Sequence, residues 1–237
     1  MSYKGNVQWP NKIHLNDMND LRPFFQQHLS RLLVVSTCTA KKRFRPPDQL
    51  TMVELDNHEL RKHGELRLIR YCLPAAEMYT GDGHKFVRQA LGELRGHGYH
   101  VSHFILSAGY GLLNESDQIV PYNVTFSGVS KAWIRERGQR LRLRNRLIEI
   151  ASKHDRVILI LGREYLEAIG LPLPVAELPP TLAYLATSLI QRVGNGIETI
   201  SIGQAERRTM SAYSSSAKEK QFQLDVYNWL RTGVNHA

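Results

Sequence analysis

Short runs that are hydrophobic on both faces constrain the fold of this chain more than any other feature. Residues 32–35 form one such run, and residues 157–161 form another. A strand in the middle of a parallel sheet, which is buried on both faces, has this pattern. Two further strands are predicted at 100–107 and 197–202. Helical patterns separate them, so the sequence predicts an α/β fold, a three-layer α/β/α sandwich with a short, mostly parallel sheet.

The predicted helices alternate with these strands along the chain. The clearest spans residues 84–95, where the apolar side chains fall on one stripe. Other helices are predicted at residues 17–29, 130–153, 164–170, 181–192 and 216–230. Length and composition together suggest a polar N-terminal arm at 1–30 and a single domain at 31–237.

The composition points to a polyanionic partner. Lys and Arg number 31 against 22 Asp and Glu, a formal net charge of +9. Such a balance favours nucleic acid over a membrane surface as the partner. The two cysteines, Cys38 and Cys72, suit a reducing cytoplasm and argue against a disulfide framework or a structural zinc. We see no signal peptide and no run long enough to span a membrane, so we expect a cytoplasmic protein.

Residues 104–125 are the most informative stretch for function. An apolar run, Phe104 to Leu106, leads into small residues and then into Glu115, Asp117, Tyr122 and Asn123. Loops that leave the carboxyl end of a buried strand hold the ligands of open α/β sheets. A pair of carboxylates, a phenol and an amide on one such loop have the composition of a site. The alternative is an ordinary solvated acidic turn.

Two other strand exits carry basic or hydroxyl side chains. The exit after Val35 reaches four cations, Lys41, Lys42, Arg43 and Arg45, which together suggest a phosphate clamp. The exit after Ile202 offers the candidate DNA-binding residues Arg207, Arg208, Ser211 and Ser214. Solvated or flexible loops are the alternative in both places. In a parallel sheet these exits share one edge, so we expect them to meet around a single cleft.

Other charged or metal-binding patterns are less specific. The arginines of residues 130–153 either create a positive field that steers nucleic acid or form a solvated face. His97, His100 and His103 repeat at intervals of three, but Gly96 and Gly98 interrupt a helix there, so we expect no metal and no cofactor. The glycines around Asp82 precede a helix and could hold an anion, without the spacing of a nucleotide-binding P-loop.

Three motifs together resemble a known family. They are VVSTCTAKK at 34–42, AEMYTGDGHKF at 76–86 and ILSAGYGLL with IVPYNVT at 105–125. They are similar to small bacterial domains related to one domain of archaeosine synthase and to the uracil-DNA-glycosylase-like superfamily. The resemblance covers roughly residues 30–205. It implies a three-layer fold, a nucleic-acid substrate and chemistry on a nucleobase, in particular a DNA glycosylase directed at modified phage DNA.

The chain departs from that superfamily at several positions. Asn123 stands where many relatives carry Asp, and the Gly-Gln-Asp-Pro-Tyr motif that activates water is absent after the first strand. The final His-Pro-Ser motif is also absent, and Gly203-Gln204-Ala205 stands there. Catalytic roles therefore do not transfer intact from the uracil-DNA glycosylases.

The resulting hypothesis is a monofunctional N-glycosylase that flips a nucleotide and releases its base without a cofactor. Asn123 or Glu115 would position water, and Asp117 or Asp82 would stabilise the developing charge. The expected base pocket consists of Tyr110, Tyr122, Phe126 and Cys38. A lyase step would need an amine, for which Lys41 is a candidate. Two alternatives are a nucleobase-modifying enzyme of the archaeosine-synthase type and a non-catalytic DNA-binding module.

Overall fold

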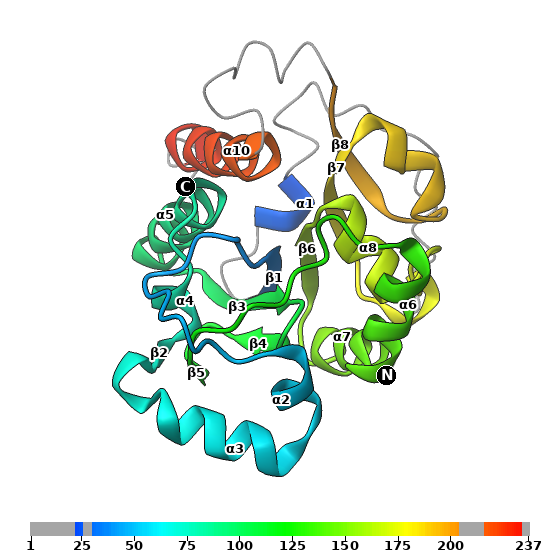
Figure 1. The fold of residues 1–237 in the computed structure, drawn as a ribbon. Coiled ribbons are helices and arrows are strands. Elements are labelled where there is room, and N and C mark those ends of the chain that lie inside the picture. Colours follow the sequence, from blue (N-terminus) through cyan, green and yellow to red (C-terminus); the bar gives the residue numbers. More distant parts are fainter. Residues whose placement is uncertain (1–21, 26–29, 204–215, 234–237) are drawn as a thin grey trace.

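A six-stranded, mostly parallel sheet forms the centre of the computed structural model, with helices on both faces (Figure 1). The structure describes residues 22–25, 30–203 and 216–233. The strand order is β4-β3-β1-β6-β7-β8, and only the β3–β4 pair among these is antiparallel. The predicted fold class, an α/β/α sandwich with a mostly parallel sheet, is confirmed.

The strands are short, and most are buried. Their bounds in sheet order are β4 Gly111–Asn114, β3 His100–Ser107, β1 Arg31–Thr37, β6 Arg156–Ile160, β7 Thr181–Ala186 and β8 Glu198–Ile202. A second, two-stranded sheet pairs β2 (Leu73–Pro74) with β5 (Gln118–Ile119). The strand predictions at 32–35, 100–107, 157–161 and 197–202 are thus confirmed to within a few residues.

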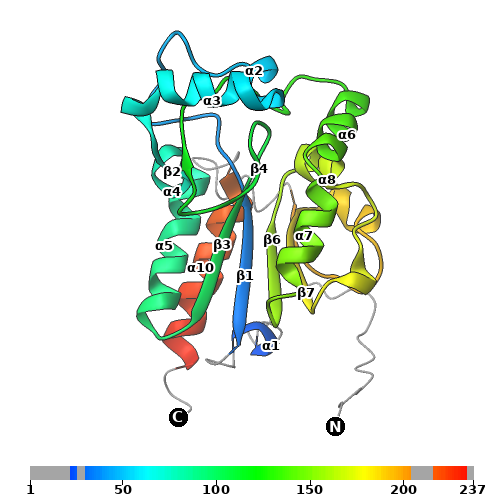
Figure 2. The ribbon, with the colours of Figure 1, turned by 90° about the horizontal axis from the view of Figure 1, so that it is seen from below.

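The helices divide between the two faces of the sheet and its edge. One face carries α1 (Arg22–Phe25), α5 (Asp82–Gly96) and α10 (Ala217–Gly233), and the other carries α6 (Lys131–Arg140), α7 (Leu143–Ala151) and α8 (Arg163–Ile169). At the edge where β1 and β3 end lie α2 (Met52–Asp56), α3 (His58–Arg67) and α4 (Ala75–Met78), with α2 and α3 across the top in Figure 2. The described residues also contain the 3-10 elements η2 (Ile69–Tyr71), η3 (Val175–Glu177) and η4 (Thr187–Arg192).

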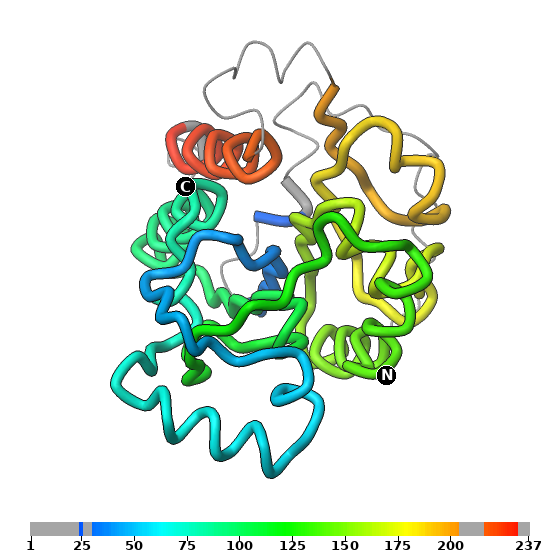
Figure 3. The backbone as a smooth tube through the Cα atoms, in the orientation of Figure 1, coloured from blue at the N-terminus to red at the C-terminus, as the bar shows by residue number. Residues whose placement is uncertain are grey.

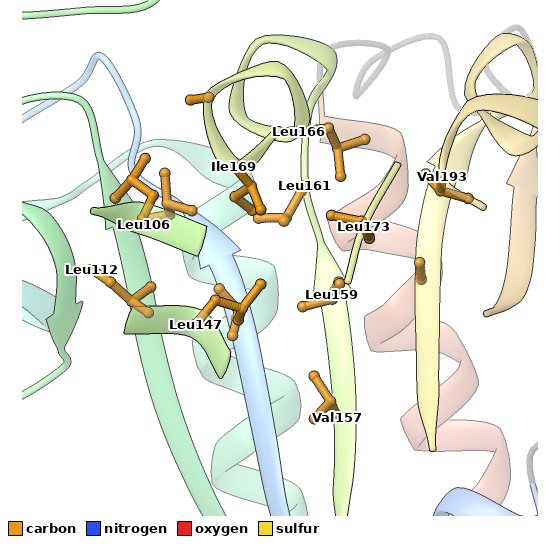
Figure 4. Packing of buried hydrophobic residues seen from close by; sticks show 14 of the residues in the cluster. Leu106, Leu112, Leu147, Val157, Leu159, Leu161, Leu166, Ile169, Leu173 and Val193 are labelled. Atoms are coloured by element: carbon orange, nitrogen blue, oxygen red, sulfur yellow. The ribbon is translucent and has the colours of Figure 1, made fainter. Parts of the chain in front are cut away.

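Buried side chains fill both interfaces of the sandwich. Figure 4 shows the cluster under α7 and α8, where Leu106, Leu147 and Leu159 belong to one continuous apolar core. On the opposite face, α1 contributes Phe24 and Phe25 to the core beneath α5 and α10. These two phenylalanines belong to the segment expected to form an N-terminal arm, and burial ties their part of it to the domain.

Several predicted elements differ from the structure. Residues 181–192 were predicted as a helix, but they form β7 followed by η4. The prediction is wrong because a strand buried on both faces has no polar alternation that would distinguish it from a buried helix. The predicted loop after β3 turns back at Gly111, which has a φ of 84°, and forms β4. The single helix predicted at 130–153 is broken into α6 and α7 by Arg142, whose φ is 52°.

No helix in the described part of the chain is long and apolar enough to cross a membrane.

Candidate functional site

The carboxyl end of β1 lies at the point where the chain changes direction across the sheet. From β1 the chain passes to β3 on one side, and it later returns to β6 on the other side. The exits of β1 and β6 therefore lead away from each other and leave a crevice between them. Open α/β sheets bind their ligands at such switch points, beyond the carboxyl ends of the strands.

A cleft of about 390 Å³ occupies this position. We call it the Lys42 cleft; its walls are Cys38, Thr39, Ala40, Lys42, Arg45, Gln49, Tyr122, Asn123, Val124, Thr125, Ser127 and Tyr165. Its volume is within the range of small-molecule sites. The exits of β1 and β3 meet here as the sequence predicted, and α8 after β6 adds Tyr165.

Backbone pairing holds these two exits together. Leu50 donates its N–H to the Pro121 carbonyl at 3.0 Å, and Asn123 donates its N–H to the Leu50 carbonyl at 2.8 Å. The segment after β1 and the segment around Tyr122 consequently run side by side in Figure 3. Asn123 is exposed on this ladder, and its side chain is among those that line the cleft.

Lys42 owes its position to an extended backbone. Lys42 pairs with Tyr79 in an antiparallel bridge, and Arg43 donates its N–H to the Met78 carbonyl at 2.8 Å. Alternate side chains of an extended segment point to opposite sides. Lys42 is accordingly half-buried, while Lys41, Arg43 and Arg45 are exposed. The four cations, equivalent in the sequence, therefore differ in burial: Lys42 is half-buried, and the other three are exposed.

The Lys42 amine lies 4.1 Å from the centre of the Tyr122 ring. An aromatic face attracts a cation. Burial has the opposite effect and lowers the pKa of Lys42; Cys38 raises this pKa and Arg45 lowers it further. The net direction is downward, so Lys42 loses its proton more easily than a solvated lysine does.

Tyr122 is itself fixed by a chain of hydroxyl groups beneath the cleft. Ser107 Oγ accepts the N–H groups of Gly109 and Tyr110 at 3.2 and 3.1 Å, which uses both of its lone pairs. Its own proton is then donated to Tyr122 Oη at 2.7 Å, and Tyr122 donates to Tyr79 Oη at 2.8 Å. Burial raises the pKa of both phenols well above 10, so both stay neutral at physiological pH.

Gly109 makes the approach of the Tyr122 ring possible. A Cβ atom at this glycine would lie 2.6 Å from the Tyr122 ring. The turn that contains it is anchored from outside, because buried Arg137 donates to the carbonyl groups of Ala108 and Gly109 at 3.0 and 2.9 Å. Arg137 also forms an ion pair with Asp56 of α2.

This anchoring changes the interpretation of the arginine-rich segment 130–153. Arg135 pairs with Glu167, Arg140 pairs with Asp56, and Arg144 donates to the carbonyl groups of Gly170 and Pro172. These side chains have partners within the fold and are neither a purely solvated face nor a free basic stripe. The structure assigns them mainly to packing α6 and α7 against their neighbours.

The two loop carboxylates of the predicted site lie outside the Lys42 cleft. Glu115 accepts hydrogen bonds from Arg95 at 2.5 Å and from the His103 ring at 3.2 Å. Burial disfavours its charge, but the bonds from His103 and Arg95 and the charge of Arg95 outweigh burial and lower its pKa to about 2. Asp117 is exposed and accepts the Asn114 N–H at 2.8 Å in the β4–β5 turn.

His103 and Ser36 continue the Glu115 network into the sheet. Burial lowers the pKa of His103, so the ring is neutral and donates Nδ1–H to Glu115. Its Nε2 then accepts the Ser36 hydroxyl at 2.9 Å. His97 bonds the Glu93 carbonyl instead, so the His97-His100-His103 spacing does not create a cluster. In the described part of the chain, no group of three or more His, Cys, Asp or Glu side chains could hold a metal ion.

A second cavity lies beside the Lys42 cleft and shares Cys38, Thr39 and Ala40 with it. We call it the Ser36 cavity; its volume is about 380 Å³, and its remaining walls are Ser36, Thr37, Lys41, Gly81, Asp82, Gly83, His84, Val87, Ser216 and Glu219. Asp82, a candidate catalytic residue, is exposed here and pairs with Lys85 at 3.3 Å. Asp82 and Asn123 therefore belong to different cavities.

The remaining predicted site residues have varied positions. Tyr110 and Phe126 are buried and line neither cavity: Tyr110 packs edge-on against Tyr122, and Phe126 packs against Trp133 and Tyr165. Cys38 lines both cavities, with its Sγ 3.1 Å from Tyr165 Oη. Arg207, Arg208, Ser211 and Ser214 lie outside the described residues.

The sequence reasoning missed Tyr165, Gln49 and the individual position of Lys42. An extended stretch between Thr39 and Phe44 would have indicated alternation, with Lys42 and Phe44 on the inner side. Tyr165 and Gln49 carry no local signal, because tertiary packing alone brings them to the cleft.

The fold and the cleft together define an α/β/α domain with a polar, cationic crevice at the switch point of its sheet. A family model described as a family of unknown function (DUF6884) matches residues 69–183 of this chain. That stretch includes Tyr79, Tyr122 and Asn123, and it begins after the loop that carries Lys42. No curated protein compared with the chain matches it.

Proposed function

We propose that the protein is an N-glycosylase that excises a modified nucleobase from DNA and leaves an abasic site. The observation that carries this proposal is the Lys42 cleft, a polar crevice at the switch point whose charged side chains are all cations. A flipped nucleotide has a flat, hydrogen-bonding base and a flanking phosphate, and both fit this chemistry.

Charge distinguishes this cleft from a general ligand pocket. Lys42 and Arg45 are the basic residues among its described walls, which contain no Asp or Glu. Exposed Lys41 and Arg43 extend the positive region outward along the same loop. A polyanion is therefore attracted to the entrance and meets no acidic group within the described walls.

The chemical roles follow from position. Gln49, Asn123, Thr125 and Tyr165 offer amide and hydroxyl groups to a base or to water. Asn123 is the proposed water-orienting residue, because its side chain lines the cleft, whereas Glu115 is committed to Arg95 and His103. Cations around the entrance would hold flanking phosphates. We propose a cytoplasmic role against modified DNA, including that of phages.

Direct detection of both products tests the proposal. Purified protein is incubated with unmodified DNA and with phage DNAs that carry different modified bases. Released base is measured by mass spectrometry, and abasic sites are measured by alkaline cleavage. The proposal predicts both products, in equal amounts, from at least one modified DNA.

Two other results would assign a different function. A change in the mass of the base without its release would indicate a nucleobase-modifying enzyme. Binding without chemical change on any of the DNAs would indicate a binding module.

A further inference from the structure

Lys42 is the feature of the cleft that base release by water does not require. Exposed Lys41, Arg43 and Arg45 already offer solvated basic side chains for phosphate contacts. Lys42 instead turns inward, half-buried, with its amine over the Tyr122 ring at 4.1 Å. Its position corresponds to that of a reacting group inside the cleft.

The surroundings of Lys42 favour the neutral amine. Desolvation is the largest influence on its pKa and lowers it, and the nearby guanidinium of Arg45 adds to this effect, while Cys38 opposes it. A carboxylate in ion-pair contact would keep the lysine protonated, and the described walls of the cleft contain none. Lysines become nucleophiles by such desolvation beside another cation.

The geometry also keeps the amine in place. Pairing of Lys42 with Tyr79, and of Arg43 with Met78, fixes the backbone on which the side chain stands. The hydroxyl chain from Ser107 through Tyr122 to Tyr79 fixes the ring beneath the amine. A nucleophile held in this way loses less orientational freedom when it reacts.

We propose that Lys42 forms an imine with the C1′ aldehyde of an abasic site and thereby gives the protein a DNA lyase activity. This proposal rests on the proposed function for the origin of its substrate, since base release produces the abasic sugar. It replaces the expectation of a monofunctional enzyme, and it places the amine at Lys42 instead of Lys41, which lines the Ser36 cavity.

The reaction balances without a cofactor. The Lys42 Nζ lone pair adds to the C1′ carbon of the open-chain aldehyde, and loss of water gives a protonated imine. Removal of a C2′ proton by water sends its electron pair to form the C2′–C3′ double bond, and the C3′–O bond breaks. The strand carrying the 5′-phosphate leaves. Hydrolysis of the imine then releases the unsaturated sugar and restores the amine.

Borohydride trapping on DNA with one preformed abasic site tests this inference without any need for base release. We expect a covalent protein–DNA adduct on a denaturing gel, with the modified peptide containing Lys42. The adduct should form efficiently near pH 8, where a solvated lysine is mostly protonated. Absence of an adduct at saturating protein, or modification at another residue, would overturn the proposal.

Three variants separate chemistry from binding and folding. Lys42→Arg keeps the charge but cannot form an imine, so trapping should fall at least tenfold while affinity for abasic DNA, measured by fluorescence anisotropy, stays within about threefold. Lys42→Met should also fail to trap. Lys153→Met is the matched control, because Lys153 is exposed just after α7 and pairs with Glu149, and its trapping should equal that of the wild type. Trapping by Lys42→Arg at the wild-type level would exclude Lys42 as the nucleophile.

The two proposals fail in different ways. Base release from modified DNA without trapping would leave the glycosylase proposal standing and exclude the imine. Trapping on abasic DNA without base release from any modified DNA would leave the imine standing and exclude the glycosylase.

Discussion

The Lys42 cleft and the Ser36 cavity share one wall and have nearly equal volumes, yet their charges are opposite. The cleft has Lys42 and Arg45, whereas the cavity has Asp82 and Glu219 against Lys41. An anionic substrate would be attracted to the first and resisted by the second. Volume alone would not distinguish them; the sign of the lining charge does.

The Ser36 cavity is also lined by residues with buried polar atoms whose hydrogen bonds are unmet. His84 Nδ1 and Glu219 Oε2, both on residues that line the Ser36 cavity, are buried acceptors with no hydrogen-bond partner among the described residues. His84 Nε2 faces the Ala76 carbonyl at 2.9 Å, which places the ring proton on that nitrogen. Groups of this kind favour a donor and repel phosphate oxygens. The comparison therefore favours the Lys42 cleft as the place of the proposed DNA chemistry.

The largest expected effect tests this assignment through Asn123. Asn123→Ala should lower the rate of base release about 100- to 1,000-fold, as the loss of one donor that acts in the transition state does. Asn123→Asp should retain part of the activity, because a carboxylate can also orient water. Asn145→Ala, an exposed amide on α7, is the control and should release base normally. Normal release by Asn123→Ala would move the reaction away from the cleft.

Gly109→Ala should disturb the Lys42 cleft selectively. The new Cβ would meet the Tyr122 ring at 2.6 Å, so the ring and the Lys42 amine above it must shift. We expect a loss of about 1–3 kcal/mol in the free energy of unfolding, measured by urea denaturation. Gly92→Ala is the matched control, since a Cβ atom there meets nothing within 4 Å. Equal stability of the two variants would contradict the tight contact.

His84, which lines the Ser36 cavity, should make the stability of the protein depend on pH. Burial lowers the pKa of His84 to about 4, although its bond to the Ala76 carbonyl acts in the opposite direction. Between pH 6.5 and 4 the unfolded chain therefore binds a proton that the folded protein excludes, so stability falls as the pH falls, by about 1.4 kcal/mol per unit. Buried His103, whose pKa is also lowered, adds to this slope, and Asp225, whose pKa burial raises to about 6, opposes it. The slopes of the wild type and of His84→Gln, measured by urea denaturation across this range, should therefore differ by about 1.4 kcal/mol per pH unit. An unchanged slope in that variant would assign the effect to other groups.

The smallest effect concerns the entrance to the cleft. Arg45→Gln should weaken binding to DNA of any sequence and reduce the slope of log affinity against log salt concentration by about one unit. Arg146→Gln, on an exposed part of α7, serves as the control for a general loss of positive charge. Equal slopes in both variants would show that Arg45 makes no phosphate contact.

Secondary structure could be predicted from the sequence where the pattern that determines it lies within a few neighbouring residues. The runs at 32–35 and 157–161 are local, so β1 and β6 were predicted correctly. The Thr181–Ala186 segment was misassigned because a doubly buried strand and a buried helix share one hydrophobic pattern. Arg142 breaks the helix without a glycine or proline, so no local residue signals the break between α6 and α7.

For the site, topology was predictable and individual partners were not. Parallel strands place their exits at one edge, and the exits of β1 and β3 do meet in the Lys42 cleft. Nothing local shows that Glu115 pairs with Arg95 and His103 instead of facing the cleft. Those partners lie on other elements, α5 and β3, and only the turn back at Gly111 brings Glu115 beside them.

Backbone N–H and carbonyl groups in the turn at 107–110 already form hydrogen bonds within the protein. Arg137 occupies the carbonyl groups of Ala108 and Gly109, and Ser107 occupies the amide groups of Gly109 and Tyr110. Backbone groups are the part of a protein that substitution cannot alter, and here both amide protons and one lone pair of each carbonyl group are already used. In the proposed glycosylase, preference among bases would then depend on cleft side chains such as Gln49 and Thr125, which a single codon change can replace. A scaffold arranged in this way can follow a changing target without rebuilding its fold.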